Sequence, residues 1–174
     1  MVGYLMNIFQ NIISMDIIKI EANIKVHENP DSLDRKDQEL LLFASEQVNK
    51  AYAPYSLFRV GAAVRLEDGS LFPGSNQENA SYPLCMCGER VALYNAAANA
   101  PDKKPVSLAI VIKNEKKPVT SPVSPCGACR QVISEFENRY QSPIRILLKA
   151  DGHTVYEIQS VKDILPLNFD ASYL

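Results

Sequence analysis

Three cysteines and one glutamate in this sequence have the spacing of a metal site. Cys126 and Cys129 form a Cys-x-x-Cys motif directly after a proline, and Cys87 precedes Glu89 by two positions. Two thiolates from the start of one helix can reach a single tetrahedral ion, and the third cysteine supplies another sulfur. A Cys-x-x-Cys motif alone would suit a redox pair equally well. The two motifs together predict a zinc site.

Three protein ligands without an obvious fourth are typical of a catalytic zinc site, because structural sites are closed by four. Cys85 is the remaining cysteine, and its place before the expected helix predicts a small buried hydrophobe whose side chain points elsewhere. His27 and His153 lie outside the motifs and are predicted to be surface histidines. In a reducing compartment, disulfides between these cysteines are not expected.

The residues after Cys87 are suited to activate water at such a site. Zinc bound by three thiolates carries a negative charge, which opposes ionisation of a bound water. Arg90 can turn its guanidinium toward the thiolates, and two helix N-termini add roughly +0.5 charge each. With this compensation we expect the pKa of the water to approach about 7. Glu89 lies close to the metal without being a ligand, so we expect it to move the protons.

The pattern of apolar residues predicts the elements that position these groups. An Ala-rich helix over 87–100 ends before Pro101, and a second helix over about 127–140 follows a Pro- and Ser-rich loop. An earlier helix begins at a Ser32 or Asp34 cap and ends before Pro54. Strands are predicted at 17–27, 59–66, 70–75, 106–112, 144–148 and 154–158, with a short helix at 160–165.

The order of these elements predicts an α/β fold. Strand 106–112 is almost continuously apolar, which indicates burial on both faces. We therefore expect a three-layer α/β/α arrangement around a central mixed sheet of about five strands. Residues 1–30 are interpreted as an N-terminal extension with a short edge strand, and residues 31–174 as the catalytic domain.

Composition excludes several classes of function. The chain has 174 residues, of which 47% are hydrophobic and 22% charged, as in a single globular domain. Its net charge of −2 argues against a nucleic-acid partner, because such proteins carry a clustered positive face. No apolar run reaches the roughly 20 residues of a membrane span, and residues 1–14 lack the pattern of a signal peptide. We therefore expect a cytoplasmic protein without a membrane partner.

The motifs resemble those of the zinc deaminases. Cys-x-Glu followed by Pro-Cys-x-x-Cys is the arrangement of that superfamily in its three-cysteine form. Residues 52–63, 76–82 and 125–131 make the chain most similar to the small homotetrameric cytidine deaminases of pyrimidine salvage. The resemblance implies one Zn²⁺ per subunit, a homotetramer, and hydrolysis of free cytidine or deoxycytidine to uridine or deoxyuridine plus ammonia. It also implies that zinc-bound hydroxide attacks C4 while Glu89 shuttles protons.

The resemblance also implies how the substrate is bound. By position, Asn76 and Glu78 bind the ribose hydroxyls, and Phe58 stacks on the pyrimidine. Gly88 contacts the pyrimidine through its main chain, at a position where the family usually has Ala, so these contacts are expected to be weaker. A neighbouring subunit is expected to complete the pocket with Ala80, Tyr82 and Phe169.

Three alternatives remain open at this point. A related zinc aminohydrolase of the blasticidin type would keep the chemistry, but Asn76-x-Glu78 argues against a ligand without ribose. A deaminase of bases in polynucleotides would need a basic channel, which an acidic chain does not offer. A binding module with a structural zinc would need a fourth ligand, and Glu89 would then have no function.

Overall fold

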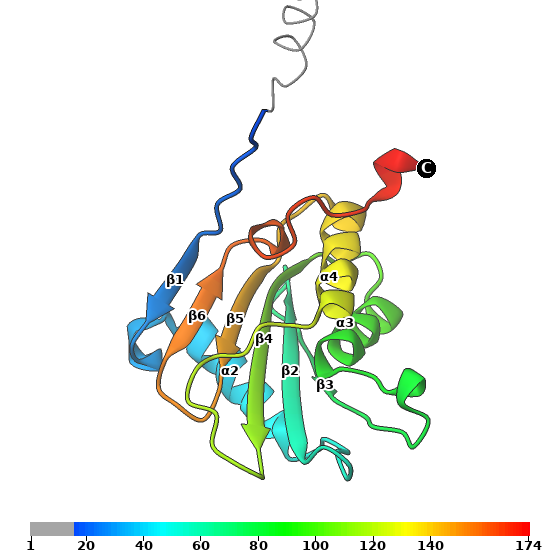
Figure 1. Ribbon diagram of the computed structural model, residues 1–174. Coiled ribbons are helices and arrows are strands. Elements are labelled where there is room, and N and C mark those ends of the chain that lie inside the picture. The colour runs from blue at the N-terminus through cyan, green and yellow to red at the C-terminus, as the bar shows by residue number, and fades with distance from the viewer. Residues whose placement is uncertain (1–15) are drawn as a thin grey trace, which may run out of the picture.

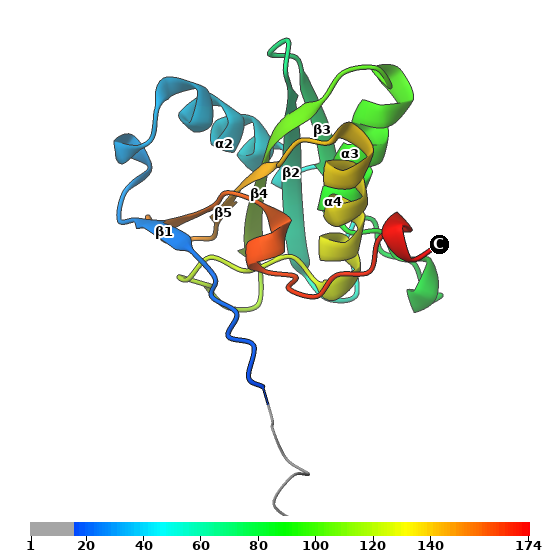
Figure 2. The same cartoon turned by 90° about the horizontal axis from the view of Figure 1, so that it is seen from above.

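The structure, a computed structural model, describes residues 16–174 and contains a single six-stranded sheet with helices on both faces (Figure 1). Figure 2 shows helix α2 on one face and helices α3 and α4 together on the other. This is the predicted three-layer α/β/α arrangement. The elements are β1 (Ile24–His27), α2 (Arg35–Val48), β2 (Phe58–Leu66), β3 (Leu71–Ser75), α3 (Gly88–Asn99), β4 (Pro105–Asn114), α4 (Gly127–Tyr140), β5 (Arg145–Lys149) and β6 (Val155–Ile158).

The sheet has the order β1-β6-β5-β4-β2-β3 and is mixed, as predicted. Strand β4 runs parallel to β5 and antiparallel to β2. Successive residues of β4 alternate between two apolar cores: Ile110 packs on the side of α3 and α4, whereas Val111 packs on the side of α2. Burial on both faces explains why this strand is almost uniformly apolar in sequence.

Several predicted boundaries are corrected by the structure. The N-terminal strand covers only Ile24–His27 instead of 17–27; it pairs with β6, and the sheet has six strands where about five were expected. The predicted helix over 160–165 is a single 3₁₀ turn, Val161–Asp163. Residues 1–14, which were predicted not to be a signal peptide, lie outside the described residues. None of the helices within 16–174 is long and apolar enough to cross a membrane.

Strand β1 is joined to the domain by hydrogen bonds to a buried glutamate. Glu157 on β6 is 6% exposed; its carboxylate bonds His27 Nε2 at 2.8 Å and accepts a hydrogen bond from Lys25 Nζ at 3.1 Å. The other ring nitrogen of His27 bonds Ser32 Oγ at 3.1 Å. The prediction of a surface His27 is therefore wrong, because strand pairing turns its side chain onto Glu157. His153 is exposed, as predicted.

The Glu157 carboxylate is expected to make stability depend on pH. Burial acts to raise its pKa, but hydrogen bonds from His27, Lys25 and Gln159 hold the pKa below the usual range. A carboxyl whose pKa is depressed on folding stabilises the protein above its unfolded pKa of about 4.3, and this stabilisation is lost as pH falls through the folded pKa.

We therefore expect Glu157→Gln to lower the free energy of unfolding at pH 7 by about 1–3 kcal/mol, the usual effect of a hydrogen bond to a charged group. The variant should also lose less stability than the parent between pH 5 and pH 3. Urea unfolding at several pH values measures both effects. The exposed Glu46 on α2 provides the control variant, Glu46→Gln. Equal pH slopes for Glu157→Gln and the parent would contradict the expectation.

Candidate metal and catalytic centre

Three cysteine sulfurs meet where α3 and α4 begin. The Sγ atoms of Cys87, Cys126 and Cys129 all lie within 4.8 Å of one another. The Cys87–Cys126 separation is 4.0 Å and the Cys126–Cys129 separation is 3.5 Å. Sulfurs around a tetrahedral zinc at the usual Zn–S distance of about 2.3 Å are spaced by about 3.8 Å. The donor set and its spacing therefore fit zinc.

The cysteines take their positions from the starts of the helices. Cys87 is the N-cap residue of α3, and Cys126 is the N-cap residue of α4. Cys129 lies in the first turn of α4 and is fully buried. The positive ends of two helix dipoles therefore point toward the thiols, which favours their anionic form.

Charge compensation by a side chain is also present. Arg90 Nη2 donates to Cys87 Sγ at 3.7 Å and to the Cys85 carbonyl at 3.4 Å. The hydrogen bond from Cys129 lowers the pKa of Cys87 to about 5; burial opposes this shift, and Arg90 adds to it. The hydrogen bond with Cys87 and burial raise the pKa of Cys129. Arg90 thus lies where the sequence predicted a compensating cation.

Glu89 is the buried acid of the centre. It lies in the first turn of α3, is 5% exposed, and its Oε2 has no hydrogen-bond partner among residues 16–174. Burial raises its pKa, a backbone hydrogen bond opposes the shift, and the neighbouring Cys87 thiolate raises the pKa further. A carboxyl with a raised pKa and a free oxygen is suited to accept and return a proton.

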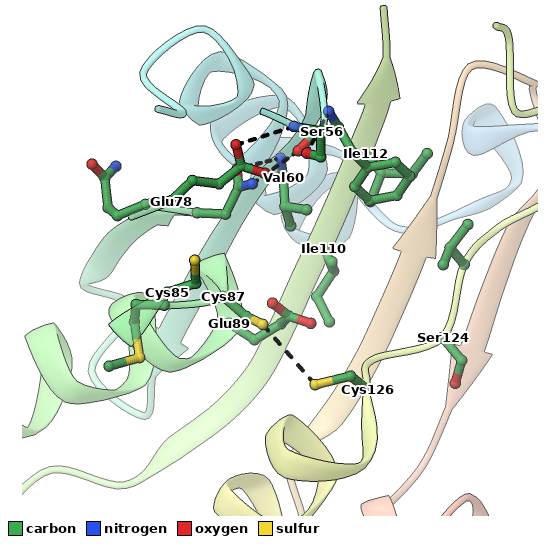
Figure 3. A pocket seen from close by; sticks show the side chains of 15 residues that line it. Ser56, Val60, Glu78, Cys85, Cys87, Glu89, Ile110, Ile112, Ser124 and Cys126 are labelled. Atoms are coloured by element: carbon green, nitrogen blue, oxygen red, sulfur yellow. Dashed lines mark hydrogen bonds between the residues drawn. The ribbon is translucent and has the colours of Figure 1, made fainter. Parts of the chain in front are cut away.

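The centre opens into a cavity of about 470 Å³, large enough for a small organic ligand. Figure 3 shows Cys87, Glu89 and Cys126 at one end and Glu78 with Ser56 at the other. The sequence did not indicate the walls, because β-branched residues of a buried strand are normally core residues. The lining residues not expected from the sequence are Ser56, Val60, Gln77, Met86, Ile110, Ile112, Val123 and Ser124.

Cys85 was predicted incorrectly. Its side chain lines the cavity instead of pointing away, and it is half-buried. Its Sγ accepts a hydrogen bond from the Asn79 N–H at 3.2 Å, and it lies outside the group of three cysteines that could hold a metal. The position of Cys85 before the start of α3 did not predict this orientation, because the loop from Asn79 to Cys85 folds back on itself.

Three of the residues expected to bind the nucleoside, Phe58, Asn76 and Glu78, line the cavity. Glu78 Oε2 accepts hydrogen bonds from the backbone N–H groups of Tyr55 at 2.9 Å and Ser56 at 3.2 Å. Burial acts to raise the pKa of Glu78, but its hydrogen bonds outweigh burial and hold the pKa below the usual range. The Asn76 amide accepts from Val60 N–H and donates to the Phe58 carbonyl, both at 2.8 Å. Asn76 thus joins the end of β3 to β2.

The remaining predicted residues lie around the cavity or outside it. Gly88 is buried, and a Cβ there would lie 3.1 Å from the Val60 carbonyl oxygen, a tight contact. Tyr82 is 68% exposed and lines an adjoining hollow with Glu78 and Cys85. Phe169 is 58% exposed and stacks on Tyr173. Ala80 is exposed. Ala80, Tyr82 and Phe169 are not among the described residues that line the main cavity.

Comparison with known proteins places this centre in a family. Residues 34–141 match the family model of the cytidine and deoxycytidylate deaminase zinc-binding region. A cytidine deaminase of Sporosarcina psychrophila is 40% identical over 141 residues, which cover 79% of this chain and 96% of the relative. A cytidine deaminase of Halalkalibacterium halodurans is 44% identical over 101 residues, 58% of this chain and 72% of the relative.

Solved structures agree with this placement. The crystal structure of cytidine deaminase from Burkholderia pseudomallei superimposes with a TM-score of 0.66 at 39% identity, covering 75% of this chain and 97% of that one. The matched region contains all three clustered cysteines and Glu89. The chain therefore belongs to the cytidine and deoxycytidylate deaminase family of zinc-dependent hydrolases.

Proposed function

We propose that this chain hydrolyses free cytidine and deoxycytidine to uridine and deoxyuridine, with release of ammonia, in pyrimidine salvage. The observation that carries the proposal is the buried Glu89 carboxyl, which lines a cavity beside three clustered thiols and whose Oε2 has no hydrogen-bond partner among residues 16–174. Cys87, Cys126 and Cys129 would hold Zn²⁺, which when bound supplies the Lewis acidity that makes a water nucleophilic at neutral pH.

Glu89 would carry the protons of the reaction. Its carboxylate takes one proton from the attacking water and delivers it to ring nitrogen N3 as a C–O bond forms at C4. The same group then transfers the second proton of that water to the exocyclic amine, and the C4–N bond breaks. Water and substrate thus become the uracil product and ammonia. Because burial holds the pKa of Glu89 above its usual range, the side chain can hold a proton between these steps.

The far end of the cavity would bind the sugar. Both backbone N–H donors to Glu78 bind Oε2, so Oε1 is the oxygen that would accept from a ribose hydroxyl. Asn76 would add one remaining N–H, since its other amide functions are bound to β2. Phe58 would pack against the pyrimidine, and Gly88 would contact it through the main chain.

The charge of the cavity favours a nucleoside over a nucleotide. The described residues that line it include two carboxylates, Glu78 and Glu89, but no Lys, Arg or His. A 5′-phosphate would bring negative charge toward these carboxylates, and the described residues that line the cavity include no cation to pair with it; Lys116, which acts on the charge of Glu78, lies outside this lining. We therefore propose free nucleosides as substrates, not the monophosphates that the family name also includes.

Oligomerisation is proposed as well. Tyr82, Phe169 and Ala80 are exposed, and the first two present large apolar surfaces that partner subunits would cover. We propose a cytoplasmic homotetramer in which a neighbouring subunit contributes these three residues to the pocket. Sedimentation velocity tests the tetramer, which a monomeric protein at micromolar concentration would contradict.

A panel of substrates tests the function. Zinc-loaded protein is expected to deaminate cytidine and deoxycytidine, measured as loss of ultraviolet absorbance, and to turn over deoxycytidylate at least about 100-fold less well, a difference of about 2.7 kcal/mol. Cytosine, which lacks the ribose, should also be a poor substrate.

Turnover of blasticidin S without turnover of cytidine would favour the related aminohydrolase instead. Zinc-loaded protein that acts on none of these compounds would contradict the proposal altogether. Comparable rates for deoxycytidylate and deoxycytidine would contradict the argument from cavity charge alone. Glu78→Gln provides a second check, because it should raise KM for cytidine more than it lowers kcat.

A further inference from the structure

The two helices that carry the cysteines begin without ordinary caps. Cys87 and Cys126 occupy the N-cap positions, and in the described chain neither side chain bonds a backbone N–H of its helix. Their sulfurs instead face each other, 4.0 Å apart. An N-cap side chain normally satisfies the first helical N–H groups and fixes the direction of the preceding loop. Another group must therefore hold each loop in place.

An arginine near the start of each helix reaches back over that N-terminus. Arg90 follows Cys87 by three positions, and Arg130 follows Cys126 by four. Positive side chains are electrostatically unfavourable at the positive end of a helix dipole. Specific contacts must offset this cost, and for Arg90 they include the sulfur of Cys87 at 3.7 Å.

Arg130 makes a different set of contacts. Its Nε donates to the Pro125 carbonyl at 2.8 Å, its Nη2 to Ser124 Oγ at 3.1 Å, and its Nη1 to the Ile164 carbonyl at 2.9 Å. No sulfur is among its hydrogen-bond partners within residues 16–174. A planar guanidinium can hold three acceptors in one fixed geometry, which a lysine ammonium cannot reproduce.

The loop that Arg130 holds forms one side of the centre. Residues 117–125 have neither helix nor strand, yet they supply Val123 and Ser124 to the cavity wall and lead directly into Cys126. The Pro125 carbonyl belongs to the peptide that joins Pro125 to Cys126, so its orientation sets the direction in which the cysteine leaves the loop.

We infer that Arg130 is a positioning residue that fixes the loop before α4, a helix whose N-cap side chain makes no capping hydrogen bond. It fixes the loop that carries Cys126 and ties this loop to the C-terminal segment at Ile164. It acts on the geometry of the metal centre through hydrogen bonds, whereas Arg90 acts on the charge of a ligand sulfur. The inference rests on the proposed zinc site, and it does not depend on which substrate is used.

Two variants of Arg130 and one of its partner test the inference. Arg130→Met and Arg130→Lys are expected to speed zinc loss to a chromogenic chelator by about 10–100-fold, the usual effect of removing a group that orients a metal ligand. Ser124→Ala removes a single acceptor and should give a smaller acceleration. In all three, the pH midpoint of kcat/KM should match the parent, because no charge touching a thiolate has changed.

Two matched variants provide the comparison. Arg139→Met removes an exposed arginine from the last turn of α4, where it lies over the Tyr140 ring, and should leave zinc loss unchanged. Arg90→Met should move the pH midpoint upward. Zinc loss from Arg130→Lys and Ser124→Ala within twofold of the parent would overturn the inference, as would a shifted midpoint in the Arg130 variants. Failure of the parent to deaminate cytidine would instead contradict the proposed function, and the zinc measurement would still stand.

Discussion

Glu89→Gln is expected to lower kcat/KM for cytidine by roughly 10²–10⁴-fold, the contribution usual for a general acid–base group. The glutamine has nearly the same shape, so the buried position of the side chain in the first turn of α3 should be preserved. An amide, however, cannot take a proton from water or return one to the leaving amine. The loss should appear mainly in kcat, because the proposed ribose contacts at Glu78 would remain.

Zinc content separates this effect from damage to the metal centre. Glu89 lies outside the group of three cysteines that could hold the ion, so the variant should bind one zinc per chain like the parent. Glu135→Gln on the exposed face of α4 is the control for a charge removed at a distance. Activity of Glu89→Gln within tenfold of the parent, at full zinc content, would exclude Glu89 as the proton carrier.

Gly74→Ala is expected to destabilise the protein by about 3 kcal/mol, at the upper end of the usual cost of overpacking. A Cβ at this position of β3 would lie 2.3 Å from the Ala92 nitrogen and 2.4 Å from the Gly88 carbonyl oxygen, both of them backbone atoms of α3. Backbone cannot rotate away as a side chain can, so the helix itself must move. For a chain of this length the melting temperature should fall by roughly 6–12 °C.

The same displacement should impair the metal centre, since Cys87 and Glu89 belong to the start of α3. Gly127→Ala is the matched control: a Cβ on this first residue of α4 meets no atom within 4 Å, so its stability should change by less than about 1 kcal/mol. Thermal unfolding of both variants measures the difference. Equal melting temperatures for the two would show that α3 does not pack on β3 as described.

The chemistry of the centre was predictable from the sequence because it depends on short-range spacing. Cys126 and Cys129 share one helical turn, and Glu89 follows Cys87 by two residues, so local helix geometry already restricts where these side chains lie. The almost unbroken apolar run of β4 similarly indicated a strand between two layers. Local patterns of this kind led to the three-layer fold, to a zinc site and to Glu89 beside it.

Tertiary structure alone decided which distant residues surround that centre. Ile110 and Val123 become cavity walls because sheet pairing and a long loop bring them there, and in sequence both are ordinary core residues. Cys85 turns into the cavity, and His27 turns onto Glu157, through contacts between segments whose pairing no local period encodes. Hydrophobic burial and hydrogen bonding depend on contacts between all layers of the fold, so the outer shape of the site follows from the packing of these layers together.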